Sequence, residues 1–218
     1  MAKSTISCQV DNFSKLLSNI KAIKGAGKTA VTNTLKDVKA RAPGWIASEV
    51  TQVYNIKKAE ITPPGKGATP RKMAGSLRVT GETFEDFALT YEGRLLTPVH
   101  FGMTPKSPPH GKNYTLKMQV IKGSKQTIGR YKAKRMPNGP YSARSHNILM
   151  STGNAKEGGV NYIPFQRMSK RRLDLQKFTT TSVPQMITSE RTHEAIMKKL
   201  NTETEKRLEH NLKRVLGK

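Results

Sequence analysis

The sequence predicts an α+β fold, with helices near the N-terminus, one long helix at the C-terminus and strands between them. Apolar residues recur three and four positions apart near both ends of the chain, which is the spacing of amphipathic helices. Between these ends, short segments alternate apolar and polar residues, which is the pattern of strands. The 218 residues, 35% of them hydrophobic, suffice for one modest core. We therefore expect a single domain over residues 1–218, with long basic loops or arms.

Residues 9–54 have helical spacing. The apolar positions of the segment Phe13–Val38 follow it in two blocks. Gly25 and Gly27 lie between the blocks and are expected to separate two helices. Pro43 is expected to open a further helix, because proline is favoured in a first helical turn.

Strands are expected between residues 75 and 177. The Pro-containing segments Thr104–His110 and Lys132–Arg144 should interrupt them, since proline donates no hydrogen bond to a sheet ladder. Residues 102–145 are therefore expected to form a basic arm region. The expected strands are Ser76–Thr80, Phe84–Tyr91, Thr115–Ile121, His146–Ser151 and Val160–Phe165.

The C-terminal segment 189–216 predicts one long helix, with Ser189 as its N-cap. Its apolar stripe steps by four residues, so it should wind around the helix axis. The stripe is consistent with a helix packed on the core or with a subunit contact. Its members are Ile196, Leu200, Thr204, Leu208, Leu212 and Leu216.

The charge distribution is the strongest functional signal. Lys and Arg outnumber Asp and Glu by 39 to 15, and the 64 residues Gly93–Lys156 contain twelve Lys or Arg and no acid. Like charges repel in a compact chain, so this stretch points to a polyanion or an acidic neighbour. Non-specific attraction to nucleic acid, an arm lying on an acidic protein and a solvated loop all remain open. The candidate contact residues are Lys122, Lys125, Arg130, Lys132, Lys134, Arg135 and Arg144.

No pattern of catalytic, cofactor or metal-binding residues stands out, so we expect a protein that is not an enzyme. Cys8 is the only cysteine, which excludes an intrachain disulfide and a four-Cys zinc site. The segment Gly25–Thr29 ends like a phosphate-binding loop, but Ala22 stands where that motif requires glycine. The five histidines lack metal-ligand spacing, and the acidic cluster Glu82, Glu85 and Asp86 is best explained as a solvated strand end rather than an acid–base pair.

No signal-like segment or membrane-spanning stretch is expected either. The sequence starts Met1-Ala2-Lys3-Ser4-Thr5, and no run approaches the roughly 20 apolar residues that span a bilayer. Use in the cytoplasm is therefore expected, unless a larger particle carries the chain elsewhere.

The last third carries a recognisable order of elements. A strand ends in Phe165-Gln166-Arg167, a basic turn follows, and Ser182-Val183-Pro184-Gln185-Met186 then precedes the long helix. With the segments 11–17 and 208–216, this order resembles the tail-completion proteins of long-tailed bacteriophages, the minor tail protein Z group and its head–tail joining relatives. The resemblance covers about half of the chain and leaves out residues 102–145. It assigns motif or packing roles to Phe165, Arg167, Ser182, Val183, Pro184 and Met186.

The resemblance implies an antiparallel sheet flanked by the N-terminal helices and the long C-terminal helix. It also implies a structural virion protein of the phage neck, assembled in the host cytoplasm. Its partners would be further copies of itself in a ring of about six, the tail tube or tail terminator protein, the head connector proteins, and genomic DNA bound without sequence preference. Neither a cofactor nor a membrane is implied. The alternative is a free basic nucleic-acid-binding protein that acts in packaging or on the ribosome. A nuclease would need clustered carboxylates for metal ions.

Overall fold

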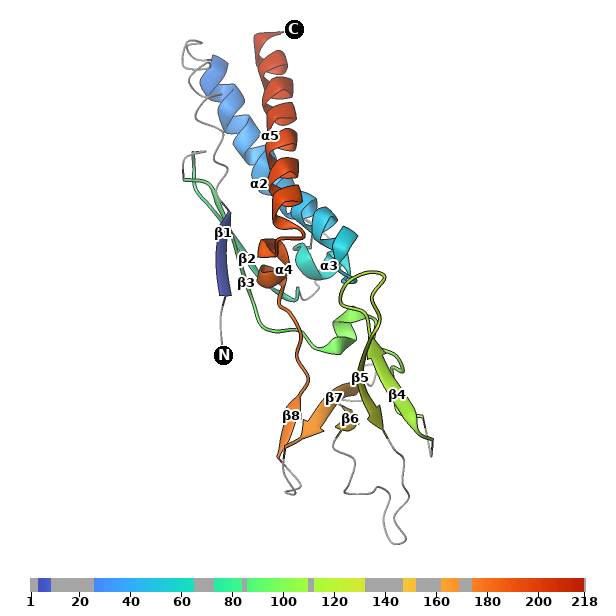
Figure 1. The fold of residues 1–218 in the computed structure, drawn as a ribbon. Coiled ribbons are helices and arrows are strands. Elements are labelled where there is room, and N and C mark those ends of the chain that lie inside the picture. The colour runs from blue at the N-terminus through green and yellow to red at the C-terminus, as the bar shows by residue number, and fades with distance from the viewer. Residues whose placement is uncertain are drawn as a thin grey trace. The chain divides into compact units, whose positions relative to one another are not determined.

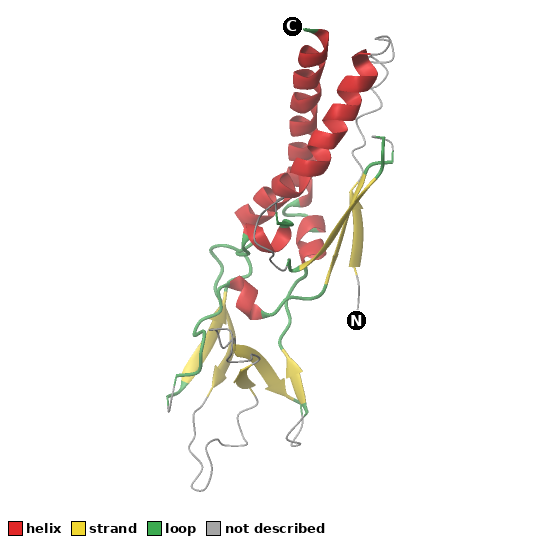
Figure 2. Ribbon diagram, turned by 180° about the vertical axis from the view of Figure 1, so that it is seen from behind, coloured by secondary structure: helices red, strands yellow, loops and turns green. Residues whose placement is uncertain are grey.

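The computed structural model describes residues 4–8, 26–64, 73–83, 86–109, 112–131, 147–151, 162–168 and 174–217. Helices and small antiparallel sheets are both present, which confirms the α+β class (Figures 1 and 2). The chain forms two compact units, where the sequence suggested one domain. Unit 1 comprises Met1–Val53, Lys57–Arg94 and Ser182–Lys218, and unit 2 comprises Tyr54–Ile56 and Leu95–Thr181.

Helices α2 (Ala26–Val53) and α5 (His193–Leu216) lie side by side in unit 1 (Figure 1). Helix α2 runs through Pro43 without a break, so the predicted helix start at Pro43 is wrong. It begins at Ala26, between Gly25 and Gly27, and the predicted separation of two helices at these glycines stays a prediction, because the residues before Ala26 are not described. An internal proline costs a helix about 3 kcal/mol through its missing hydrogen bond and its ring. Buried apolar residues lie on both sides of Pro43, at Val38, Ala42, Ile46 and Val50, and their packing offsets this cost. The predicted helical residues 9–25 lie outside the described part of the chain.

Helix α5 begins at His193 rather than at Ser189, because a separate short helix, α4 (Val183–Thr188), precedes it. Ser189 is the C-cap of α4 and has extended backbone angles. Its carbonyl accepts hydrogen bonds from the amides of Thr192 and His193, at 3.0 and 2.9 Å. The N-cap of α5 is therefore Thr192, and the predicted end at Leu216 is confirmed.

The apolar stripe of α5 is buried only over its first part. Ile196, Leu200, Thr204 and Leu208 are buried, Leu212 is half-buried and Leu216 is 50% exposed. A four-residue step advances about 40° beyond one full turn, so the stripe winds away from α2. Asn211, three residues after Leu208, takes the buried position instead. Its amide nitrogen donates to Thr34 Oγ1 and Asp37 Oδ2 of α2, both at 3.2 Å.

The sheet of unit 1 has the strand order β1-β3-β2, with β1 (Ser4–Cys8), β2 (Gly75–Thr80) and β3 (Ala88–Gly93), all antiparallel. Strand β2 agrees with its prediction, β3 starts later than predicted, and β1 was not predicted. Helix α4 packs on β3: a Cβ atom at Gly93 would lie 2.9 Å from Pro184 Cδ, so only glycine fits there. The short helix α3 (Lys58–Ile61) completes unit 1.

The described residues of unit 2 form the 3₁₀ helix η1 (Pro98–Phe101) and two sheets. The first sheet pairs β4 (Tyr114–Met118) with β5 (Gln126–Tyr131). The second has the order β6-β7-β8, with β6 (Asn147–Ser151), β7 (Tyr162–Arg167) and β8 (Leu175–Lys177). A small apolar cluster consists of Met103, Leu116 and Leu149, with Tyr114, Ile128 and Tyr162 packed against it.

The sequence predicted β4, β6 and β7 to within a few residues but missed β5 and β8. Strand β5 falls inside the predicted basic arm region. The described part of that region is thus largely a β-hairpin and not a loose excursion. Pairing with β4 satisfies the backbone hydrogen bonds of β5, which its polar sequence gave no reason to expect.

Candidate polyanion-binding surface

The β4–β5 hairpin of unit 2 is amphipathic. Leu116 is fully buried on one side of β4, so its neighbours Thr115 and Lys117 point to the other side. On that outer side Thr115 lies opposite Arg130, and Lys117 lies opposite Thr127. Lys117, Thr127 and Arg130 are exposed. The outer side therefore presents two cations and two hydroxyl groups.

A bulge in β5 is the reason that Arg130 points outward. The register shifts between Leu116 and Lys117, whose partners are Gly129 and Thr127, so Ile128 is an extra residue in the ladder. Such a bulge lets Ile128 and Gly129 occupy the same side of the sheet. Ile128 packs on the apolar cluster. Without the bulge, Arg130 would share the inner side with Ile128, where its charge would oppose folding.

The turn that joins β4 to β5 carries two further cations and is held by backbone hydrogen bonds. Gly123 has φ +83°, and the Ser124 amide donates to the Ile121 carbonyl at 3.1 Å. The amide of Asn55 donates to the Val120 carbonyl at 2.9 Å. Lys122 and Lys125 are exposed on this turn, as the prediction for a contact surface requires.

The edge of β4 that does not pair with β5 is also held by backbone hydrogen bonds. Thr104 and Lys117 exchange both of their backbone hydrogen bonds, each at 2.9 Å, and the Gln119 amide donates to the Phe101 carbonyl at 3.1 Å. These bonds do not involve the Lys117 side chain. The lysine ammonium is therefore presented on a backbone that the rest of unit 2 fixes in place.

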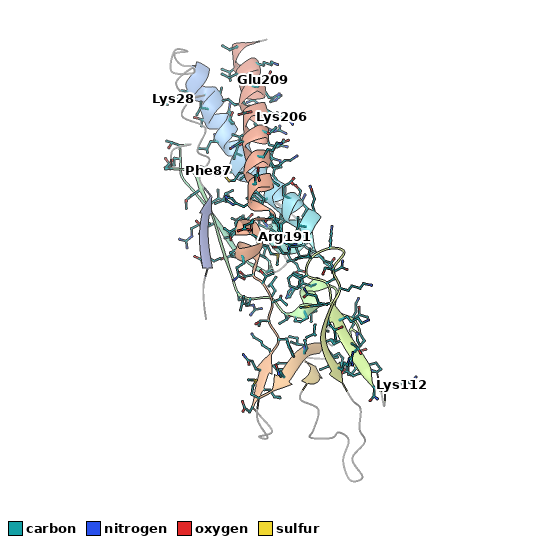
Figure 3. All side chains as sticks on the ribbon, viewed as in Figure 1. Lys28, Phe87, Lys112, Arg191, Lys206 and Glu209 are labelled. Atoms are coloured by element: carbon teal, nitrogen blue, oxygen red, sulfur yellow. The ribbon has the colours of Figure 1, made fainter. Side chains whose placement is uncertain are left out.

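We call the exposed side of this hairpin the cationic hairpin face. Thr115, Lys117, Thr127 and Arg130 form its centre. Lys112, just before β4 (Figure 3), and the turn residues Lys122 and Lys125 flank it. Residues 95–156 contain no acid, and the only acid among the described residues of unit 2 is Asp174. Cations beside hydroxyl donors are the groups with which proteins contact phosphate backbones.

The predicted contact residues divide into two groups. Lys122, Lys125 and Arg130 belong to the surface just described, whereas Lys132, Lys134, Arg135 and Arg144 lie outside the described residues. Lys117, Lys112 and the two threonines were not among the predicted site residues. The alternation around Leu116 was a usable signal for Thr115 and Lys117, because a buried strand residue sends both neighbours outward.

The motif Ser182–Met186 has a structural explanation. Ser182 is the N-cap of α4, and its side chain accepts a hydrogen bond from the Gln185 amide at 3.4 Å. In return, the Gln185 side chain accepts one from the Ser182 amide at 2.9 Å, which completes a capping box. Pro184 lies in the first turn, and Val183, Pro184 and Met186 are buried. The packing role predicted for these residues is consistent with this arrangement.

Phe165 and Arg167 lie on β7, as predicted, with Phe165 half-buried and paired with Lys177 of β8. The amide of Met168 donates to the Asp174 carbonyl at 3.0 Å, just beyond the end of that pairing. Strand β7 thus continues through the residues that carried the first part of the resemblance.

The acidic cluster before β3 is a turn. The amides of Glu82 and Thr83 donate to the Asp86 carboxylate at 3.1 and 2.6 Å, and the Thr83 hydroxyl also donates to it. The hydrogen bond from the Thr83 side chain, followed by those from the two amides, lowers the pKa of Asp86 from 3.8 to about 2. Asp86 is therefore a turn-stabilising carboxylate that stays ionised at neutral pH, which makes it a poor proton acceptor. Glu85 lies outside the described residues.

Among the residues that the structure describes, His, Cys, Asp and Glu side chains form no group of three that could hold a metal ion. Within the same ranges, no helix combines the length and the apolar character needed to cross a bilayer.

Comparison with known proteins returned no match to a family model, to a curated protein or to a solved structure.

Proposed function

We propose that this chain is a structural, non-enzymatic protein of a bacteriophage neck, which completes the tail and joins it to the head connector. In this proposal about six copies form a ring around the path of the DNA. The tail tube or tail terminator protein lies on one side of the ring and the connector proteins on the other. The virion is then the place where the protein acts, after assembly in the host cytoplasm.

The observation that carries the proposal is the uneven distribution of charge. Unit 2 has 16 Lys or Arg against two Asp or Glu, a formal net charge of +14 in 90 residues. Its described core is small, and the cationic hairpin face is held by backbone hydrogen bonds rather than by neutralising acids. A unit built in this way gains stability when a polyanion or an acidic neighbour covers it. A ring around DNA supplies such surroundings without any need to read sequence.

The order of elements from β7 to α5 is the second support, because it is the part that resembles tail-completion proteins. Among the described residues, strands β7 and β8, the capped short helix α4 and the long helix α5 follow one another along the chain, which supports the proposal. The alternative, a free nucleic-acid-binding protein, is favoured by the cationic hairpin face alone.

The test is the location and copy number of the chain in purified particles. The chain is tagged at Lys218, phage particles are purified, and its amount is measured by quantitative mass spectrometry against the tail-tube protein. We expect a fixed stoichiometry of about six copies and a gold label at the head–tail junction in electron micrographs. Absence from the particles, with the chain found instead on nucleic acid in cell extracts, would establish the free binder.

Removal of Lys122–Arg144 is not a clean functional test, because it deletes β5 and leaves β4 without its partner. Substitution of exposed cations preserves the hairpin. The variant Lys122→Gln/Lys125→Gln is expected to fold normally and to reduce the yield of joined particles. An unchanged yield would remove the turn from the joining mechanism.

A further inference from the structure

The cationic hairpin face carries cations and hydroxyls but no aromatic ring among its described side chains. Tyr114 is the aromatic residue of β4, and it packs on the apolar cluster on the inner side. Proteins that hold single strands add aromatic platforms on which bases stack. The described side chains on the outer side of this hairpin are cations and hydroxyls, which suit contacts with phosphate oxygens.

The backbone of the face is also held by hydrogen bonds on several sides. Its strands are paired over five register positions, its turn is bonded to Asn55, and β4 is bonded to Thr104 on its other edge. A fixed backbone loses little conformational entropy on binding. Such a surface suits a regular ligand, and the phosphate backbone of a duplex is regular, whereas a single strand must be ordered first.

We infer that the cationic hairpin face binds the phosphate backbone of double-stranded DNA, independently of sequence and in preference to single strands. This inference deepens the proposed function, on which it rests for the identity of the polyanion. The contacting cations are Lys117 and Arg130 at the centre, with Lys112, Lys122 and Lys125 beside them.

The salt dependence of DNA binding measures how many phosphate contacts this face makes. Each phosphate contact with duplex DNA contributes about −0.9 to the slope of log K against log salt. If all five cations make contact, this face contributes a slope of about −4.5. Loss of two central contacts should reduce the slope by about 1.8, which makes the loss of affinity between 50 and 200 mM salt about tenfold smaller.

The experiment measures binding of the full chain to a 30-base-pair duplex by fluorescence anisotropy across that salt range. The test variant is Lys117→Gln/Arg130→Gln. The control is Lys28→Gln/Lys36→Gln, which removes the same charge from exposed positions on α2 of unit 1. Thermal unfolding midpoints of both variants verify that the fold is retained, as expected for exposed side chains.

We expect the slope to become less negative by about two in the test variant and to stay unchanged in the control. The full chain should bind a second duplex of different sequence with the same affinity. Equal slopes in the two variants would overturn the inference, because overall charge would then explain binding. Tighter binding of an oligothymidine strand than of the duplex would overturn it too. If the test variant lost binding to polyglutamate but not to DNA, the face would be a protein-binding surface.

These outcomes are independent of the particle experiment. A chain found in the neck with unchanged DNA binding in the test variant keeps the proposed function and loses this inference. The reverse result, a reduced slope in a chain that is absent from particles, keeps this inference and loses the neck.

Discussion

Units 1 and 2 handle charge in opposite ways. Unit 1 has 23 Lys or Arg and 13 Asp or Glu in 128 residues, a net charge of +10, whereas unit 2 carries +14 in 90 residues. On α5 the cations alternate with acids and form ion pairs, such as Lys213 with Glu209 at 2.7 Å and Lys206 with Glu203 at 3.2 Å. Hydrogen bonds from these lysines lower the pKa of Glu209 and of Glu203.

Most of the buried apolar side chains among the described residues belong to unit 1. The unit with the smaller core therefore carries the larger unbalanced charge. Selection for stability alone would favour the reverse, since self-repulsion destabilises a compact state. Unit 1 balances more of its charge with acids, whereas the excess charge of unit 2 is the feature that the proposed binding of a polyanion would explain.

The largest expected effect is on the core of unit 1. Leu200 of α5 is only 1% exposed. The variant Leu200→Ala should therefore lower the free energy of unfolding by about 2–5 kcal/mol. The control Leu216→Ala, at a half-exposed position of the same stripe, should change it by less than about 0.5 kcal/mol. Trp45, the only tryptophan, lies in α2 and reports this transition by fluorescence in a denaturant titration. Equal losses in the two variants would contradict the winding of the stripe.

A smaller expected effect is a difference between the two units in how salt changes their stability. Screening of like charges should stabilise unit 2 by roughly 0.5–1 kcal/mol when NaCl rises from about 20 to about 300 mM. Hydrogen exchange measures this locally: the Asn55 and Lys117 amides, bonded to Val120 and Thr104, report unit 2. The Ile196 amide, bonded to Thr192, reports unit 1 and should gain less protection. Equal gains at all three amides would show that the charge difference has no energetic consequence.

The smallest effect is the pH dependence of the turn at Asp86 in unit 1. Its pKa in the folded chain, about 2, lies below its ordinary value of 3.8, so ionised Asp86 favours the folded state above about pH 4. This contribution is lost as the pH falls from about 4 to about 2. Carbon NMR of the Asp86 carboxyl group should give a midpoint near 2, and Asp86→Asn should reduce the acid sensitivity of the unfolding midpoint in that window. A midpoint near 4 would show that the turn does not hold the carboxylate.

Elements with a regular hydrophobic pattern were predictable from the sequence, because the burial of one apolar side explains each pattern. The stripe of α5 and the alternation around Leu77 and Leu116 follow from burying one side of an element, and they predicted the end of α5 and the strands β2 and β4 to within a few residues. Strands β1, β5 and β8 were missed, because polar or very short segments become strands through pairing with a partner. The helix across Pro43 was missed for a related reason, since packing outweighed a local preference.

The candidate surface likewise has one property that the sequence determines and another that depends on the tertiary structure. The excess of cations and the absence of acids over residues 93–156 are properties of the composition, and the sequence alone determined them. Which cations lie on one face was decided by the tertiary structure. The bulge at Ile128 turns Arg130 to the side of Lys117, and hydrogen bonds to Asn55 and Thr104 hold that side in place. The net charge depends only on composition, but a charged face forms only after distant segments pair and fix the direction of each side chain.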